Sequence, residues 1–483
     1  MKKYLILIAF AFLFPYCTQL YANTWTKTFG GTGDDYCGSV QQTSDKGYIM
    51  CGMTECNAWL IKTDSLGNTV WTKTYGGTDY DEGSSVQQTE DGGYIVAGTT
   101  HLDSSDYGNA WLIKTNSMGD TLWTRRFGGS MFDAGRSVQQ TKDKGYIIAG
   151  QTGSYGAGNS DVWLIKTDSI GDTLWTRTFG GTGRDEGRSV RQTIDGGYIV
   201  GGLTYSYGAG ISDMWLIKTD SAGNSLWTKT FGGDSCDEGG SVQQTTDGGY
   251  IITGFTWFYS TSGWKIYSSL IKTNNSGDTV WTRIFNETGV DYILSAQQTR
   301  DSGYILTGVI GWTGSYKTGN GDVWLIKTNS SGDTLWTRTF GGDTLDGGSS
   351  VQQTADGGFI IVGSTYSFGA GNEDVYLIKT DSLGNVGVEE NTPLSGRDVA
   401  TLQITKNPFV KSTVIKYFIP VRTRVILSVY DISGSCVKTL VDGEKAAGSY
   451  SSTLNAKELK TGIYFVRLTT DIHKLTKKLI LMK

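Results

Sequence analysis

One sequence unit recurs seven times in this chain, and this repeat constrains the fold more than any other feature. The string WT[KR] begins at Trp25, Trp71, Trp123, Trp175, Trp227, Trp281 and Trp336. SVQQT or a close variant begins at Ser39, Ser85, Ser137, Ser189, Ser241, Ser295 and Ser350. WLIKT[DN] or a variant begins at Trp59, Trp111, Trp163, Trp215, Ser269, Trp324 and Tyr376. A unit of about 50 residues repeated in this way predicts one repeat architecture rather than several unrelated domains.

Each unit predicts four short strands, which we call a, b, c and d in chain order. In the fourth unit they cover residues 189–193, 198–203, 214–219 and 226–231, with hairpin turns at 195–197 and 220–224. The WLIK run of strand c is apolar at consecutive positions, as expected for a strand covered on both faces. Seven such units predict an all-β fold, a seven-bladed β-propeller of four-stranded blades over residues 23–388.

A stacked solenoid is the alternative fold, and the two ends of the repeat argue against it. The chain begins with a lone strand d at Trp25, and the seventh unit has no strand d after its turn at 381–385. A linear stack would need polar caps instead. We therefore expect the N-terminal strand to complete blade 7 and close the ring, which removes two exposed sheet edges.

The N-terminus predicts export. Lys2 and Lys3 precede an apolar run over residues 5–14, so residues 1–22 are predicted to be a signal peptide, with a lipid anchor on Cys17 as the alternative. No later run is long enough to span a bilayer, so no transmembrane segment is expected in the mature chain. Export permits disulfides, and Cys51 and Cys56 are the best-placed local pair; a disulfide or free thiols are favoured over a metal site.

After Val388 the repeat stops. Residues 389–401 are predicted to be a polar linker, and residues 402–483 contain short alternating strands that predict a small Ig-like β-sandwich. This last segment has 14 Lys and Arg against 5 Asp and Glu, whereas the propeller and linker carry a net charge of about −16. An acidic propeller without a basic stripe argues against nucleic acid as a partner.

Several motifs follow one another in the C-terminal segment: Asn407, Pro408 and Phe409, then Tyr417 and Pro420, then VYDISG ending at Gly434, Gly448 and Tyr450, TGIYFVRL with Gly462 and Tyr464, and a final KLTKKLILMK with Lys477 and Lys478. This order resembles the type A C-terminal sorting domain of proteins exported by the type IX secretion system of Bacteroidetes-like bacteria. The resemblance implies recognition by that machinery, passage through the periplasm, and a secreted or outer-membrane surface location. An accessory sandwich without sorting activity is the alternative. The repeats likewise resemble propeller repeats of such exported proteins, which implies fold and no particular function.

An aspartate stands four residues before the serine of every SVQQT motif, namely Asp35, Asp81, Asp133, Asp185, Asp237, Asp291 and Asp346. We expect a ring near one end of the channel. Because the residue is repeated in all blades, we interpret it as structural, with each carboxylate accepting backbone N–H groups in a tight loop. Calcium binding by the ring is a weaker alternative, as is glycosidase chemistry by pairs formed with Glu82, Glu186 and Glu238.

The departures from sevenfold symmetry are better candidates for function. All length variation lies in the connection between strands b and c, which has 6, 12, 12, 12, 14, 15 and 12 residues in successive units. In the long loops of units 5 and 6 lie Trp257, Phe258, Tyr259, Trp264, Tyr267, Trp312 and Tyr316, our candidate ligand-binding residues. Local packing is the alternative, and one tryptophan could fill the place left by Ser269, where other units have Trp. Tyr155, Tyr207 and Phe368 recur in similar loops and are interpreted as repeated packing.

The sequence favours a surface binding or adhesion protein for glycans or surface proteins. A polysaccharide-degrading enzyme is the first alternative and a structural envelope component the second. The chain has only His101 and His473, which excludes a multi-histidine zinc site, and no phosphate-binding loop precedes a helix. We therefore predict no catalytic residue, no metal and no cofactor.

Overall fold

The computed structural model describes residues 24–77, 79–101, 107–260, 263–286, 290–312, 320–386, 401–404, 407–419, 422–432, 434–446, 448–470 and 474–482. The predicted signal peptide and residues 389–400 of the predicted linker lie outside them. Contacts divide the chain into two units, Met1–Gly387 and Val388–Lys483, and each is described by itself.

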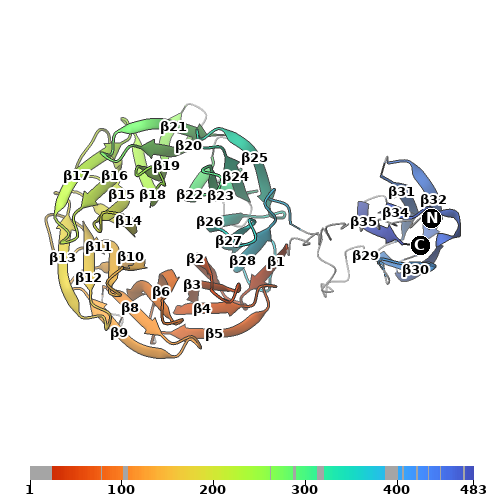
Figure 1. Cartoon of the computed structure of the whole chain (residues 1–483), viewed down its shortest axis with the longest axis horizontal. Helices are drawn as coiled ribbons and strands as arrows, with labels where there is room; N and C mark the ends of the chain where they lie inside the picture. The colour runs from red at the N-terminus through yellow and green to blue at the C-terminus, as the bar shows by residue number, and fades with distance from the viewer. Residues whose placement is uncertain are drawn as a thin grey trace, which may run out of the picture. The chain divides into compact units, whose positions relative to one another are not determined.

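The first unit is a β-propeller. Its described residues form seven four-stranded antiparallel sheets, arranged as blades around an axis with strand a innermost and strand d outermost (Figure 1). Blades 1 to 4 consist of Tyr36–Gln42 (β2), Tyr48–Thr54 (β3), Asn57–Thr63 (β4), Thr69–Tyr75 (β5); Glu82–Gln88 (β6), Tyr94–Thr100 (β7), Asn109–Thr115 (β8), Thr121–Phe127 (β9); Asp133–Gln140 (β10), Tyr146–Thr152 (β11), Asp161–Thr167 (β12), Thr173–Phe179 (β13); Asp185–Gln192 (β14), Tyr198–Thr204 (β15), Asp213–Thr219 (β16) and Ser225–Phe231 (β17). Blades 5 to 7 consist of Cys236–Gln244 (β18), Tyr250–Ser260 (β19), Gly263–Thr273 (β20), Thr279–Phe285 (β21); Tyr292–Gln298 (β22), Tyr304–Ile310 (β23), Asp322–Thr328 (β24), Thr334–Phe340 (β25); Asp346–Gln353 (β26), Phe359–Thr365 (β27), Asp374–Thr380 (β28) and Trp25–Phe29 (β1).

The ring closes as predicted. Strand β1 pairs antiparallel with β28, with Trp25 opposite Lys379, and supplies the fourth strand of blade 7. Trp25 is buried, and its ring meets Tyr48 of blade 1 edge-on at 5.7 Å between centroids. The N-terminal strand therefore joins the last blade and packs against the first.

The apolar strands form the cores between blades. Strand c of blade 4, β16, is buried along its whole length, as its uninterrupted apolar run predicted. The strand d tryptophan of each blade packs on the next blade: Trp175 meets Tyr198 at 5.9 Å and lies against the backbone of Gly223. Gly223 has a φ of +78°, and a Cβ there would overlap the indole ring. This explains both the tryptophan and the turn glycine of the repeat.

Strand a is longer than the sequence indicated. We expected it to begin at Ser189 in blade 4, but β14 begins at Asp185. A bulge between Gly187 and Ser189 absorbs the extra residue, so that Asp185 still pairs with Thr204. At the bulge the backbone carbonyl of Glu186 approaches Gly202 so closely that a Cβ would not fit. The ring aspartates therefore lie at the start of the innermost strands or directly next to it.

The second unit is a small β-sandwich. Its elements are Thr401–Ile404 (β29), Ser412–Ile419 (β30), Thr423–Asp431 (β31), Cys436–Lys445 (β32), Gly448–Asn455 (β33), the short 3-10 helix Ala456–Glu458 (η1), Gly462–Thr469 (β34) and Lys474–Leu481 (β35). One sheet has the order β29-β30-β33 and the other β32-β31-β34-β35. Their facing residues, among them Phe409, Tyr417 and Leu468, form one core.

The local disulfide that we considered is not formed. Cys51 is buried in the core between blades 1 and 2, whereas Cys56 is exposed in the turn between β3 and β4. The strand therefore directs the two thiols into different surroundings. In the part of the chain that the structure describes, Cys37, Cys236 and Cys436 are also free.

Candidate functional site: the channel and its rim

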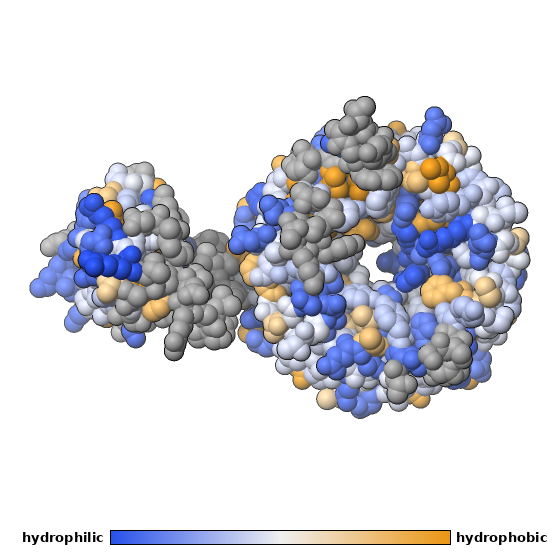
Figure 2. Space-filling view, turned by 180° about the vertical axis from the view of Figure 1, so that it is seen from behind, coloured by the Kyte–Doolittle hydropathy of each residue, from blue (hydrophilic) through white to orange (hydrophobic). Residues whose placement is uncertain are grey.

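The innermost strands enclose a channel along the propeller axis, and an opening is visible in the middle of the propeller in Figure 2. The SVQQ segments line an enclosed section of about 230 Å³. At this level the first glutamine of the motif faces the channel. We call these residues, with the arginine that replaces one of them in blade 4, the channel collar: Gln41, Gln87, Gln139, Arg191, Gln243, Gln297 and Gln352.

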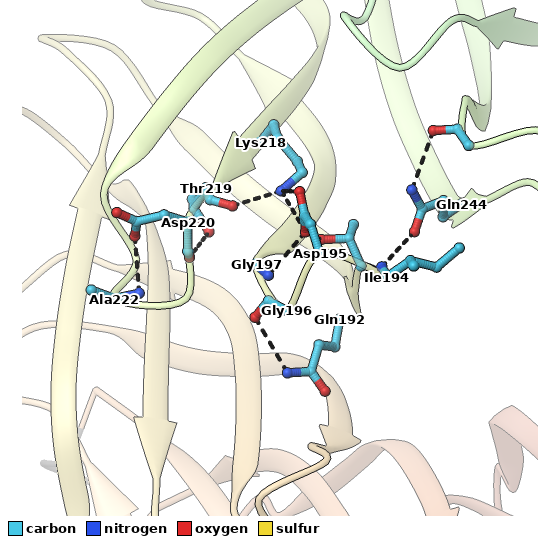
Figure 3. A network of polar contacts seen from close by, with 12 residues as sticks. Gln192, Ile194, Asp195, Gly196, Gly197, Lys218, Thr219, Asp220, Ala222 and Gln244 are labelled. Atoms are coloured by element: carbon cyan, nitrogen blue, oxygen red, sulfur yellow. Dashed lines mark hydrogen bonds and ion pairs between the residues drawn. The ribbon is translucent and has the colours of Figure 1, made fainter.

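The two glutamines of the motif connect neighbouring blades. In the collar, each glutamine Oε1 accepts the backbone N–H of the second glutamine in the next blade, at 2.6 to 2.8 Å. The second glutamine accepts a turn amide of the preceding blade, as between Ile194 and Gln244 at 2.9 Å (Figure 3). The same bond joins Ala355 of blade 7 to Gln42 of blade 1 at 2.7 Å, so the chain of amides closes on itself.

A buried lysine in strand c fixes each a–b turn. Lys218 donates to Asp195 at 2.9 Å and to the Thr219 carbonyl at 2.8 Å (Figure 3). Burial alone would raise the pKa of the Asp195 carboxyl, but hydrogen bonds from Thr193 and Lys218 hold this pKa below its usual value. The pair recurs in the other blades at 2.8 to 3.0 Å. The sequence pattern did not single out this pair, although both residues recur in every unit, the aspartate two residues after the threonine of SVQQT and the lysine in WLIKT.

The aspartate ring is buried. In blade 4, Asp185 is fully buried and accepts hydrogen bonds from the Gly181 backbone N–H at 3.0 Å, from Ser206 at 2.6 Å and from Thr204. Equivalent glycine N–H bonds of 2.7 to 2.9 Å reach the ring aspartates of five other blades in the described chain. These contacts hold the d–a connection, and the carboxylates are not presented to solvent.

A second aspartate lies beside the ring in some blades. Asp161, at the start of β12, and Asp185 both lie against Gly180, where a Cβ would overlap both carboxyl groups. Burial, and then the charge of Asp185, raise the pKa of Asp161. The same relation raises the pKa of Asp213, Asp322 and Asp374. Among the described residues, no three His, Cys, Asp or Glu side chains converge as ligands for a metal.

The rim of the channel at the b–c end of the blades carries an arc of alternating charge across blades 2 to 5. Arg136 lies 3.9 Å from Glu82 and 3.5 Å from Glu186. Arg188 lies 3.5 Å from Glu186 and 2.8 Å from Glu238. A hydrophilic patch follows one side of the opening in Figure 2. In the sequence the three glutamates stand out only as neighbours of the ring aspartates, and their arginine partners are not apparent.

Beyond Glu238 the rim becomes aromatic. Tyr292, next to the ring aspartate of blade 6, lies between two of the candidate residues, with its ring centroid 5.8 Å from that of Trp257 and 5.5 Å from that of Trp312. Phe255 meets Tyr292 at 5.4 Å. We call Phe255, Trp257, Tyr292 and Trp312 the aromatic rim cluster. The sequence pattern did not single out Tyr292 or Phe255, because both lie in strand positions.

The other candidate residues are placed differently. Phe258 and Tyr267 form a separate pair at 4.9 Å, and Phe258 follows Trp257 in the same strand, so it faces the other side of the blade. The expectation of a long loop in blade 5 was wrong: β19 and β20 extend as a hairpin, with Trp257 opposite Ile266. The backbone of Tyr259 and Trp264 belongs to this hairpin, but their side chains and the whole of Tyr316 lie outside the description.

The loop aromatics of blades 3, 4 and 7 pack on their own strand c. Tyr155 lies 5.5 Å from Trp163, Tyr207 lies 5.5 Å from Trp215, and Phe368 lies 5.6 Å from Tyr376. These contacts repeat from blade to blade, in contrast to the aromatic rim cluster. The cluster is therefore a local departure from the repeat.

In the C-terminal sandwich, the motif residues hold the last strand in place. Asn407 accepts the Ile480 amide at 2.8 Å and donates to the Lys478 carbonyl at 2.9 Å. Gly434 takes a φ of +82° in the turn after β31. Tyr464 donates to the Lys460 carbonyl at 2.8 Å. Lys477 and Lys478 lie on β35, Gly448 and Gly462 begin β33 and β34, and Pro408 precedes the buried Phe409.

Comparison with known proteins assigns the C-terminal unit to a family. Residues 407–482 match the family described as "Secretion system C-terminal sorting domain". Over 199 residues, 35% of this chain, the sequence is 25% identical to the regulatory protein FlaEY of Caulobacter vibrioides and covers 21% of it. The chain thus spans about a fifth of the length of that curated relative.

The solved structures that are similar at low sequence identity include the following two. One is PorZ, described as an essential bacterial surface component of the type IX secretion system of Porphyromonas gingivalis, with 10% identity and a TM-score of 0.41, covering 94% of this chain and 60% of that one. The other is a protein of unknown function from Dyadobacter fermentans, with 11% identity and a TM-score of 0.39, covering 73% and 97%.

None of the described residues form a helix long and apolar enough to cross a bilayer. The sorting domain implies recognition by the type IX machinery and secretion or attachment at the cell surface. The C-terminal unit is thus a type IX secretion system C-terminal sorting domain, and the chain that carries it is a secreted or surface-attached protein built on a seven-bladed β-propeller.

Proposed function

We propose that the propeller is an extracellular binding module whose ligand docks on the aromatic rim cluster. The observation that carries this proposal is the position of the cluster. Trp257, Tyr292 and Trp312 are half-buried, lie next to the channel mouth, and occur where the sevenfold pattern is broken. Recognition needs such a departure, because a contact repeated in all blades is explained by the fold alone.

The chemistry of the rim favours a glycan as the ligand class. Aromatic rings supply apolar faces for sugar rings, and Tyr and Trp lose little conformational entropy when they are covered. Glu238 pairs with Phe255 in the β18–β19 ladder and lies 2.8 Å from Arg188, so the arc of alternating charge adjoins the aromatic rim cluster. The arc offers fixed donors and acceptors for hydroxyl groups. The Trp257 indole N–H is buried and makes no hydrogen bond within the described chain.

The test is an array of extracellular glycans and surface proteins probed with the mature full-length chain. We expect binding to be lost in the variant Trp257→Ala/Trp312→Ala. The matched control is Tyr155→Ala/Tyr207→Ala, which removes two aromatic side chains of the same face that pack on their own blades. Thermal melts establish that both variants are folded. Binding that survives in the folded tryptophan variant refutes the site, and binding to a protein in place of a glycan refutes the ligand class.

A further inference from the structure

The glutamine side chains of the channel collar are each held in one orientation. Each collar glutamine uses its Oε1 to accept a backbone N–H of the next blade. This contact fixes the orientation of the side-chain amide, since an amide nitrogen cannot accept that bond. The Nε2 group of each collar glutamine is therefore directed away from the blade contact. No acceptor for these groups is found among the described residues.

The serines two residues before the collar positions also accept a backbone N–H of the next blade. The Oγ of Ser39 accepts the Val86 backbone N–H at 3.2 Å, and the Oγ of Ser85 accepts that of Val138 at 3.2 Å. Ser241 and Ser295 repeat the contact at 3.0 and 3.4 Å. A hydroxyl that accepts in this way keeps its own hydrogen to donate. The section of the channel lined by the SVQQ segments therefore offers amide and hydroxyl donors beside backbone carbonyls such as that of Val190.

Arg191 adds a positive charge to this ring of donors. Blade 4 has SVRQT where the other blades have SVQQT or a neutral variant. The Arg191 guanidinium donates from Nη1 to the Val190 carbonyl at 2.7 Å, and within the described residues it makes no ion pair. Burial lowers the pKa of this guanidinium, but arginine remains protonated at any pH at which a protein is folded.

The replacement also leaves one backbone group without its usual partner. In the other blades a collar glutamine accepts the N–H of the second glutamine of the next blade, such as Gln192 from Gln139 at 2.6 Å. The collar residue of blade 4 is Arg191, and the second glutamine of the next blade is Gln244. A guanidinium can only donate hydrogen bonds, so Arg191 cannot accept the Gln244 N–H. The Gln244 backbone N–H therefore has no side-chain acceptor from the collar. The Arg191 guanidinium and the Gln244 backbone N–H are therefore two hydrogen-bond donors at the same point of the ring.

We infer that the channel collar binds an oxyanion, a carboxylate or phosphate group, through Arg191 and the neighbouring collar amides. A guanidinium matches the geometry of both groups in a bidentate contact. The enclosed section of about 230 Å³ is large enough for the anionic end of a small molecule. A wider cavity of about 480 Å³ at the a–b turn end, lined by Gln139, Gln192 and Lys142 among others, gives access to it. The collar lies at the opposite end of strand a from the aromatic rim cluster, so the inference is independent of the proposed function.

Isothermal titration calorimetry on the mature full-length chain tests the inference, with inorganic phosphate and glucuronate as separate probes. The decisive variant is Arg191→Gln, which restores the sequence of the other blades and gives Gln244 its acceptor, so it is expected to fold. We expect saturable binding of at least one probe at one site per chain, weakened about tenfold or more in Arg191→Gln. Comparing the two probes shows whether the site takes a carboxylate or a phosphate.

Two controls separate this site from others. Lys142→Gln removes a cation that lines the wider cavity at the turn end and should leave the affinity within about twofold of the parent, because surface charges contribute little. Trp257→Ala/Trp312→Ala should bind the anion normally. If neither probe binds, if Arg191→Gln binds as tightly as the parent, or if Lys142→Gln removes the binding instead, the collar is not an oxyanion site.

Discussion

The Met214 Sδ lies 3.9 Å from the Ser269 Oγ, and this contact joins two departures from the repeat in neighbouring blades. In most blades a large strand c aromatic packs against a small residue of the preceding blade, as Trp163 packs against Ala110. Blade 5 has Ser269 in place of this aromatic, and blade 4 has Met214 in place of alanine or valine. The longer methionine occupies the space that the missing indole leaves.

This pairing predicts non-additive stabilities. Ser269→Trp alone overfills the site and should lower the free energy of unfolding by about 1–3 kcal/mol. Combined with Met214→Val, the same change recreates the usual pair and should recover most of that loss. Chemical denaturation of the four members of the cycle measures the coupling. Equal costs of Ser269→Trp in the two backgrounds would show that the residues do not share the space.

The same pair shows what a sequence can and cannot predict here. The blade count, the four strands and the closure by Trp25 follow from periodic local signals, and these predictions are confirmed. Which side chain fills the place of Ser269 depends on packing between two units 55 residues apart, which no local pattern encodes. We considered that one of the loop tryptophans fills it, but Trp257 packs on Tyr292 instead.

The candidate site was harder to predict than the fold. Trp257 and Trp312 were visible as departures from the repeat, but their contact through Tyr292 joins two blades. The extended hairpin of blade 5 was missed because the residues between Ser260 and Gly263 resemble an ordinary loop. Arg191 was visible as one changed letter in a motif. Its significance appears only when the amide ring around it is known.

Closure of the ring predicts that the first strand, β1, contributes as much to the stability of the propeller as an internal strand. Trp25→Ala removes a buried indole from the junction of blades 7 and 1 and should lower the free energy of unfolding by about 3–5 kcal/mol. Removal of residues 23–30 should lower the melting temperature sharply. Calorimetric melts check both changes, with Trp175→Ala as the internal comparison. A melt unchanged by either N-terminal variant would contradict the closure.

The buried lysine pairs predict a loss of stability in acid. Asp195→Asn leaves the Lys218 ammonium without its carboxylate and should cost about 1–3 kcal/mol at pH 7, a figure reduced because Asp195 is largely exposed. The pKa of Asp195 is lowered in the folded protein. Its contribution is therefore complete above the unfolded pKa of about 3.9 and disappears as the pH falls through the folded value.

The measurement is the unfolding free energy of the parent and of Asp195→Asn from pH 7 to pH 3. The difference should stay constant down to about pH 5 and shrink below about pH 4. Asp120→Asn, at an exposed ion pair with Lys73 on the outer strand, is the control and should have little effect at any pH. A difference that grows in acid would contradict the role of the pair.

The paired aspartates Asp161 and Asp185 predict a pH dependence of stability opposite to that of the lysine pairs. Asp161 is buried beside Asp185, and burial and the charge of Asp185 raise the pKa of its carboxyl. A raised folded pKa means that stability falls as the pH rises from about 3.9 through the folded value, so ionised Asp161 is a cost at neutral pH. Blades 1 and 2 have Asn57 and Asn109 at this position. Asp161→Asn should therefore raise the melting temperature at pH 7.

The gain should vanish near pH 3, where the carboxyl is protonated and resembles the amide in charge. Asp185→Asn is the contrasting variant, because Asp185 accepts hydrogen bonds from Gly181, Ser206 and Thr204, and its replacement should destabilise the protein at pH 7. Melting curves at the two pH values distinguish the roles. If Asp161→Asn lowers the melting temperature at pH 7, the ionised carboxylate is stabilising, and the two aspartates cannot be a repulsive pair.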